Sequence, residues 1–418
     1  MPDATVPKAR SPLLALFLAV LIDLLGFGIV LPLLPQYAKD YEAGPLMLGV
    51  LMASFSAMQF LFAPVWGRLS DRVGRRPVLM IGLAGSMLSY ALFGLAEVEG
   101  VAAALGCATP VPLLLASRIL AGLFGATIGT AYAYIADVTD ATTRGRGMAL
   151  IGAAFGLGFT IGPSIGGYAN DLIGRPAPGL IAAGLSAVAL LVAWRTITEP
   201  ARHTRAHARG WDGLRQLGSA LGAPTVGAIL LLQFLATFCF ANMEGTLALF
   251  ARAHPELRYD PAANGHLFSY LGLCLLIAQG AVVRRLLPRI GEVRFNVAGC
   301  VLLAVGLVAV PGATAEWHVW AALAVAVFGF AIVTTSMASL LSLRTPESMQ
   351  GEILGVNQSS LSLARIFGPA VGIALLPHEL EGAAATRLAW PFWLAGGLML
   401  LGLVWAIALA RRPAPGSG

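Results

Sequence analysis

The chain has 418 residues, of which 57% are hydrophobic and only 11% are charged, and its mean hydropathy is +0.79. Soluble domains carry about 25% charged residues, so this composition excludes an ordinary soluble globular protein. The net charge of +6 is spread over short loops, with no basic domain or RNA-binding motif, and this pattern argues against nucleic-acid binding.

Long apolar runs recur along the whole chain, and they approach the roughly 20 residues that a helix needs to cross a membrane. Breaks at charged residues and turn formers divide them into twelve predicted spans. Six spans lie near residues 12–34, 46–66, 78–96, 113–135, 146–168 and 178–195. Six more lie near residues 224–249, 265–283, 295–311, 318–341, 353–376 and 388–410. We therefore predict an all-α integral membrane protein, with a six-helix bundle at 1–195, a cytoplasmic linker at 196–223 and a second six-helix bundle at 224–418.

The basic residues are distributed unevenly between the two sides of these spans. Of the 27 Lys and Arg, 20 lie in segments on the side of the termini, 5 lie in the opposite loops and 2 lie within spans. Short cytoplasmic loops carry the excess of Lys and Arg in membrane proteins. The pattern predicts a multi-pass protein of the inner (plasma) membrane with both termini in the cytoplasm.

The two halves are related by an internal repeat, because residues 143–167 align with residues 349–373 at a constant offset of 206. The matched positions are Gly145 with Gly351, Gly162 with Gly368, Pro163 with Pro369, and Gly166 with Gly372. A fainter match at an offset of 217 relates Arg68, Arg72 and Gly74 to Arg285, Arg289 and Gly291. In transporters built from two parallel repeats, the substrate site lies between the halves near the middle of the membrane.

Three segments of the first half resemble a known family. GRLSDRVGRRP at 67–77 resembles the signature G-x-L-x-D-R-x-G-R-R of the major facilitator superfamily, between its second and third helices. AYIADVTD at 133–140 and FGLGFTIGPSIGG at 155–167 are similar to the fourth and fifth helices of drug:proton antiporters. LIDLLGFGIVLPLLP at 21–35 is similar to the first helix of the tetracycline-efflux branch. The resemblance implies the twelve-helix major facilitator fold and proton-coupled multidrug efflux.

The loop at 67–77 supplies candidate residues for a cytoplasmic gate, namely Gly67, Asp71, Arg72, Gly74 and Arg75. Asp71 can accept hydrogen bonds from Arg75 and can act on the N-terminus of the third span, whose dipole favours a carboxylate. Asp137, at the cytoplasmic end of the fourth span, is a second anionic partner that the resemblance also implies. We predict a latch that forms in one state, and the alternative is that the arginines only set topology.

A glycine series in the fifth span matches the antiporter motif of the family, and its members are Gly158, Gly162, Pro163, Gly166 and Gly167. Small residues about four apart share one helical face, and the proline can bend the helix. Packing alone could require this pattern. The resemblance associates it with export, and we expect it to close the cytoplasmic interface between the halves.

Four ionisable residues fall within spans, and each costs on the order of 3 kcal/mol unless it faces water or a partner. They are Asp23, Arg118, Glu244 and Arg365. A buried carboxylate gains or loses its proton as a neighbouring arginine moves, so we predict that Asp23 and Glu244 exchange protons or meet a cationic substrate. Arg118 and Arg365 would tune the proton affinity of these two carboxylates. Arg118 also matches the arginine of the family's fourth helix. Two static buried ion pairs are the alternative.

Polar and aromatic residues of the spans supply candidate ligand contacts. The polar ones are Gln59, Gln233, Asn242, Gln279, Asn357 and Gln358. The aromatic ones are Phe27, Phe234, Phe238 and Trp390. One feature departs from the tetracycline exporters, which carry an acidic residue in the third span where this chain has Ser89. Tetracycline is therefore disfavoured as the substrate.

The leading hypothesis is a secondary transporter that exports amphipathic drugs or metabolites by alternating access. The alternatives are a proton-coupled importer and a nontransporting membrane sensor or scaffold. An enzyme is disfavoured, because the six histidines form no H-E-x-x-H or comparable metal site. We expect no cofactor, no metal and a monomeric chain, whose partners are the bilayer, a small-molecule substrate and protons. Sodium in place of protons stays open.

Overall fold

The computed structural model describes residues 12–30, 33–34, 37, 40–43, 45–200, 224–254, 257, 259, 261–346, 349–377 and 385–410. Most of the predicted linker, residues 201–223, lies outside this range. The first helices are α1 (Pro12–Val30), α3 (Pro45–Val73), α4 (Arg75–Ala96), α5 (Val101–Ala104), α6 (Val111–Leu123), α7 (Thr127–Val138), α8 (Arg144–Leu172) and α9 (Ala177–Thr196). The later ones are α11 (Pro224–Ala253), α12 (Pro261–Ile277), the π-helical η2 (Ala278–Val283), α13 (Arg284–Ile290), α14 (Glu292–Ala309), the 3₁₀ turn η3 (Val310–Gly312), α15 (Glu316–Leu343), α16 (Gln350–Leu375) and α17 (Ala385–Ala410).

These helices match the twelve predicted spans, with two local differences. The fourth span is broken at residues 124–126, between α6 and α7. Trp66 donates from Nε1 to the carbonyl oxygen of Leu123 at 2.6 Å, which satisfies an acceptor that the break leaves free. The eighth span contains the π-helical segment η2 between α12 and α13. Neither irregularity was predicted from the apolar pattern.

Eleven helical stretches of the described chain are long and apolar enough to cross a membrane. The remaining predicted span is α16, which is 26 residues long but carries many polar side chains. Its Asn357, Gln358 and Ser362 are buried among neighbouring helices. The polar face of α16 is therefore turned into the protein.

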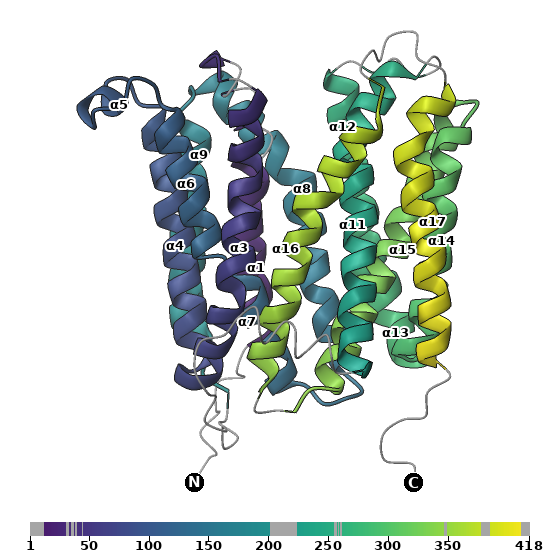
Figure 1. The fold of residues 1–418 in the computed structure, drawn as a ribbon. Coiled ribbons are helices and arrows are strands. Elements are labelled where there is room, and N and C mark those ends of the chain that lie inside the picture. The colour runs from purple at the N-terminus through teal and green to yellow at the C-terminus, as the bar shows by residue number, and fades with distance from the viewer. Residues whose placement is uncertain are drawn as a thin grey trace, which may run out of the picture.

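The helices form two bundles that stand side by side (Figure 1). The first half comprises α1 to α9 and the second half comprises α11 to α17, and each has its own apolar core. The start of α1 and the end of α17 lie at the same end of the molecule, which we call the terminal end (Figure 1). The repeated helices occupy equivalent places, because α8 packs on α1 and α16 packs on α11.

The halves meet where α3 packs on α16, and where α8 packs on α12, η2 and α13. Glycines permit this close approach. A Cβ atom on Gly67 would collide with the carbonyl oxygen of Gly351, and one on Gly156 would come within 2.8 Å of the Leu276 Cα atom. Gly145 packs on the side chain of Leu287. These contacts run from the terminal end to the middle of the helices.

Candidate transport site and gate

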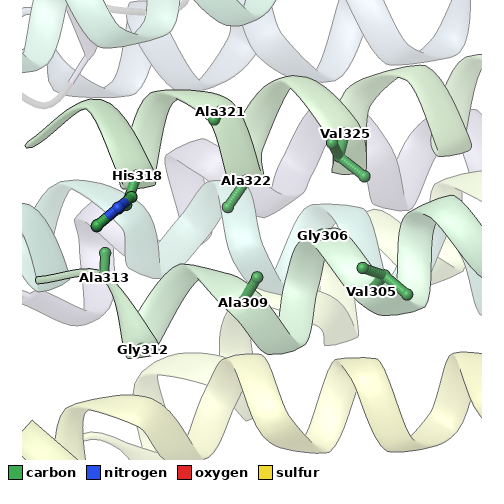
Figure 2. Close-up of a pocket in the computed structure, with 9 residues that line it drawn as sticks. All are labelled: Val305, Gly306, Ala309, Gly312, Ala313, His318, Ala321, Ala322 and Val325. Atoms are coloured by element: carbon green, nitrogen blue, oxygen red, sulfur yellow. The ribbon is translucent and has the colours of Figure 1, made fainter. Parts of the chain in front are cut away.

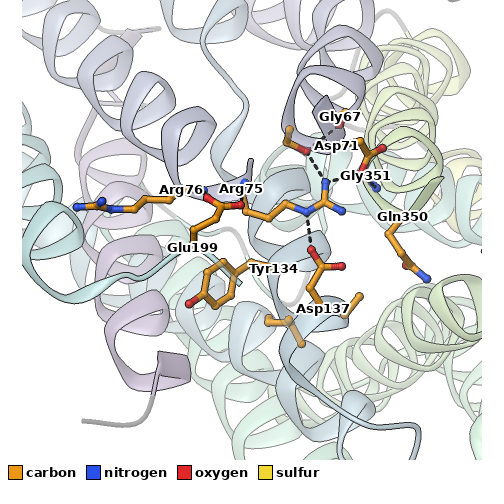
Figure 3. Close-up of polar contacts among 12 residues, drawn as sticks. Gly67, Asp71, Arg75, Arg76, Tyr134, Asp137, Glu199, Gln350 and Gly351 are labelled. Carbon is orange, nitrogen blue, oxygen red and sulfur yellow. Dashed lines mark hydrogen bonds and ion pairs between the residues drawn. The ribbon is translucent and has the colours of Figure 1, made fainter. Parts of the chain in front are cut away.

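A charged cluster lies at the terminal end, where α3 ends and α4 begins, and its side chains are drawn in Figure 3. The Arg75 Nη1 atom lies 2.5 Å from the Asp71 Oδ1 atom, and its Nε atom lies 2.7 Å from the Asp137 Oδ2 atom. Arg75 also donates to the Ser70 hydroxyl at 2.7 Å. The Arg75 side chain is only 1% exposed, so these partners replace its water shell.

Asp71 reaches across to the other half. Its Oδ1 accepts the backbone N–H of Gly351 at 3.0 Å, and its Oδ2 accepts the N–H of Glu352 at 2.8 Å. These N–H groups belong to the first turn of α16, where the helix dipole favours a negative charge. We call Asp71, Arg75, Asp137 and the first turn of α16 the latch.

The expectation that Asp71 acts on the N-terminus of the third span is wrong, because that position is taken by Glu199. The Glu199 carboxylate accepts the backbone N–H of Arg75 at 2.7 Å and that of Arg76 at 2.9 Å, at the start of α4. Gly74 has a φ of 118°, and a Cβ atom there would lie 2.7 Å from the Glu199 carboxylate. Both the positive φ and the close approach of the carboxylate require a glycine at this position. Sequence reasoning missed Glu199, which follows the end of α9 and is distant in the chain.

The other predicted gate residues lie at the same end. Gly67 forms the backbone contact with Gly351 described above. Arg72 is exposed and close enough to Glu352 to attract its carboxylate. In the adjoining loop, hydrogen bonds from Thr142 and Thr143 lower the pKa of the exposed Asp140 to about 2. Asp140 is therefore ionised at physiological pH while taking no part in the latch.

The antiporter glycines lie inside the first half and not at the interface between the halves, where we expected them. A Cβ atom on Gly158 would meet the Leu24 backbone at 2.9 Å, and one on Gly162 would meet the Gly28 backbone at 2.7 Å. Gly166 faces Ile29 in the same way, whereas Gly167 faces open space. Pro163 lies within the continuous helix α8. The motif therefore seats α8 on α1, and α8 contacts the second half through other glycines.

Asp23 and Arg118 are both held in the interior of the first half, on α1 and α6. Ser86 and Thr127 lie beside the Asp23 carboxylate. The Arg118 guanidinium carbon lies 5.0 Å from the Phe55 ring centre and 5.7 Å from that of Phe27, and the side chain is 2% exposed.

The two residues do not form an ion pair within 4.0 Å, although both belong to the described chain. Tyr90 of α4 lies close enough to interact electrostatically with both Asp23 and Arg118. Sequence reasoning missed Tyr90, and its signal was a polar aromatic residue inside the third span. The half-buried Asp23 carboxylate thus shares one region of the first half with the buried Tyr90 phenol and the buried Arg118 guanidinium.

Glu244 on α11 and Arg365 on α16 face each other at a distance that allows electrostatic attraction. They also form no ion pair within 4.0 Å in the described chain. Instead, Arg365 donates from Nη1 to the Gln59 Oε1 atom at 3.2 Å, across the interface. Tyr132 of α7 also lies near the guanidinium.

The remaining candidate contacts are dispersed. Gln59 and Gln358 join at the interface, with Gln358 donating at 3.3 Å. Gln233 donates to the Thr334 carbonyl oxygen at 3.5 Å. Asn242 and Asn357 are buried, and neither the Asn242 amide nor the Asn357 oxygen has a hydrogen-bond partner in the described chain.

The aromatic candidates divide. The Phe27 ring lies 5.8 Å from that of Phe159, beside Arg118. Trp390 is 55% exposed, so the expectation that it forms a wall of the site is wrong. A cavity of about 360 Å³ lies between α14 and α15, next to His318, and none of these candidate residues lines it (Figure 2). No three His, Cys, Asp or Glu side chains of the described chain gather as metal ligands.

Comparison with known proteins assigns this arrangement to a family. The profile of the Major Facilitator Superfamily matches residues 16–369. The chain belongs to the Major Facilitator Superfamily. Members of this superfamily are transporters and not enzymes, so the chain is a multi-pass membrane protein that transports small molecules.

Relatives within the Major Facilitator Superfamily cover almost the whole chain. The class C tetracycline resistance protein of Escherichia coli is 31% identical over 389 residues, which are 92% of this chain and 93% of that protein. Major facilitator superfamily domain-containing protein 10 of Homo sapiens is 28% identical and covers 94% of this chain and 92% of its own. The crystal structure of the human organic anion transporter MFSD10 matches with a TM-score of 0.79 and 25% identity, over 96% of this chain and all of that one. A bacterial homologue of the iron transporter ferroportin, in an outward-facing state, matches in fold with a TM-score of 0.76 and 15% identity.

Proposed function

We propose that this chain exports small amphipathic molecules in exchange for protons, by alternating access between its two halves. The observation that carries the proposal is Asp23, a carboxylate inside the first half that has no ion-pair partner within 4.0 Å among the residues that the structure describes. A carboxylate in such surroundings is favoured in its neutral form and becomes charged when water or a cation reaches it. Proton binding at Asp23 would thus alternate with exposure to each side of the membrane.

The latch supports the conformational part of the proposal. Its ion pairs and the capped first turn of α16 hold the terminal end closed, and they must separate for that end to open. We propose that the terminal end is cytoplasmic in the inner membrane, because it carries the excess of basic residues. The bundles would then be residues 1–195 and 224–418, joined by a cytoplasmic linker at 196–223, in a monomeric transporter.

A second candidate concerns the charge of the substrate. Arg118 is a buried cation whose Nε atom has no hydrogen-bond partner in the described chain, and its guanidinium lies beside two neighbouring aromatic rings, Phe27 and Phe55. Its edge suits a carboxylate or sulfonate. This geometry favours an organic anion as cargo, a class that the name of the human structural relative also carries.

Growth and vesicle assays test these proposals together. An efflux-deficient bacterial host expressing the wild type, Asp23→Asn or no transporter is challenged with a panel of antibiotics and dyes. Ethidium or carboxyfluorescein is then added to the medium around inside-out vesicles. Uptake of the dye into the vesicles, which corresponds to export from the cell, is recorded together with proton movement. We expect protection and proton-driven uptake with the wild type and their loss in Asp23→Asn. A wild type that protects against nothing and moves no protons contradicts export, and uptake in right-side-out vesicles favours the importer.

A further inference from the structure

One oxygen atom accepts three of the hydrogen bonds that join the halves near the middle of the helices. The Gln59 Oε1 atom, on α3, accepts from the Ser362 hydroxyl at 2.7 Å, from Arg365 Nη1 at 3.2 Å and from Gln358 Nε2 at 3.3 Å. All three donors belong to one face of α16. Gln59 is 1% exposed, so no bulk water competes for this acceptor.

Arg365 interacts with one polar group in each half, through a hydrogen bond to Gln59 and through electrostatic attraction to Glu244. Gln59 belongs to the first half, whereas Glu244 on α11 belongs to the same half as Arg365. Arg365 is the one charged or titratable group of the described chain whose field acts on Glu244. The helices α14, α15 and α17 also pack on α11, but their charged residues and histidine, Glu292, Arg294, Glu316, His318 and Arg387, have no comparable effect on Glu244.

The two acceptors behave differently when the halves move. The contact between α3 and α16 belongs to the interface that closes the terminal end, so opening that end withdraws Gln59 from Arg365. The contact between α11 and α16 lies within one half, so Glu244 stays beside Arg365 throughout. A guanidinium that loses a buried acceptor turns to the remaining one, because an unpaired charge in the interior is unfavourable.

We propose that Gln59 is a positioning residue that holds Arg365 away from Glu244 while the terminal end is closed. Glu244 then keeps its proton, since a half-buried carboxylate that is withdrawn from bulk water and has no paired cation is favoured in the neutral form. When the end opens, Arg365 pairs with Glu244, the O–H bond of the carboxyl group breaks, and the proton passes to water at the terminal end. This inference rests on the proposed alternating access and identifies how the proton is released at that end.

The test follows the Glu244 carboxyl group directly and needs no substrate. Purified full-length protein in lipid nanodiscs is titrated while infrared difference spectra record the protonated-carboxyl band. Glu244→Gln is introduced into the wild type and into each variant that is compared. The band that disappears on this substitution is assigned to Glu244. We expect the midpoint to fall by about one pH unit in Gln59→Leu, because Arg365 is released, and to rise by about one unit in Gln59→Glu, where the new carboxylate holds Arg365. One unit is a tenfold change in proton affinity.

Gln279→Leu is the matched control. Gln279 is also a buried glutamine at the interface, where Gly152 packs on its amide and Thr335 donates to it at 2.6 Å. Its described hydrogen-bond partners are Ala331 and Thr335 and do not include Arg365. Its substitution should leave the midpoint unchanged. Unchanged midpoints in both Gln59 variants, shifts of the same sign, or an equal shift in Gln279→Leu overturn the inference. If Gln59→Leu does not fold, the sign of the shift in Gln59→Glu decides alone.

The titration and the transport assay fail independently. Suppose that the chain moves no protons in vesicles, but that the midpoint falls in Gln59→Leu and rises in Gln59→Glu as expected. The proposed exporter is then contradicted and the role of Gln59 is kept. A chain that exports but shows no shifts keeps the exporter and overturns the role of Gln59.

Discussion

Neutralising Asp71 should open the terminal end. Asp71→Asn keeps the size of the side chain but removes the charge that faces Arg75 and the first turn of α16. The amide retains one acceptor oxygen and turns an NH₂ group toward a donor, so one of the two contacts to α16 is lost. Arg75 keeps Asp137 as its remaining carboxylate.

The contacts set the expected magnitude. A hydrogen bond to a buried charged group contributes about 1.5–3 kcal/mol, and a charge at a helix terminus contributes up to about 2 kcal/mol. Asn restores part of this stabilisation, so we take the closed state to lose about 3 kcal/mol of stability relative to the open state. That loss changes the ratio of closed to open molecules by about 140-fold. A population that is about 99% closed would become about 40% closed.

Spin-label distance measurements across the terminal end provide the assay. The exposed residues Arg195 and Arg289, in opposite halves, are replaced by labelled cysteines in a variant without the native cysteines. We expect a long-distance population to appear in Asp71→Asn. Asp140→Asn is the matched control, because among the described residues the Asp140 carboxylate bonds only to Thr142 and Thr143 of its own loop, so its neutralisation should leave the distances unchanged. Identical distance distributions for the wild type and Asp71→Asn would refute the latch.

Two further substitutions test the glycine contacts. Gly67→Ala places a methyl group against the Gly351 carbonyl of the other half, so the same spin labels should report an open terminal end, whereas Gly49→Ala meets open space and should not. Gly162→Ala overpacks the contact between α8 and α1, so it should destabilise the first half by about 1–3 kcal/mol and lower the thermal unfolding midpoint. Its neighbour in the motif, Gly167→Ala, faces nothing within 4 Å, and an equal loss of stability there would contradict this account.

The repeat and the apolar pattern predicted the architecture because both are local properties of the sequence. The equivalence of the two halves at offset 206 reappears as equivalent packing of α8 on α1 and of α16 on α11. The fainter match reappears in the backbone, since Gly74 and Gly291 both adopt positive φ angles, of 118° and 83°. A turn between two spans needs such a residue, so its glycine can be recognised in the sequence.

The partners across helices could not be predicted in the same way. That Asp71 carries a charge near a helix start is evident from the sequence, but which helix start it meets depends on how α16 crosses α3. For the same reason Glu199 was missed. The antiporter glycines show the limit most clearly, because spacing places Gly158, Gly162 and Gly166 on one face without identifying the helix that this face meets.

The polar character of α16 bears on how the chain is assembled in the membrane. On its own, a helix with Arg365 near its centre is opposed by about 2.5–3.5 kcal/mol from the arginine alone during insertion. The Gln358 amide and the Ser359 and Ser362 hydroxyls of α16 find partners on α3, which is synthesised long before it. The first half therefore acts as a template for the eleventh span, and the second half made alone should leave this segment poorly inserted.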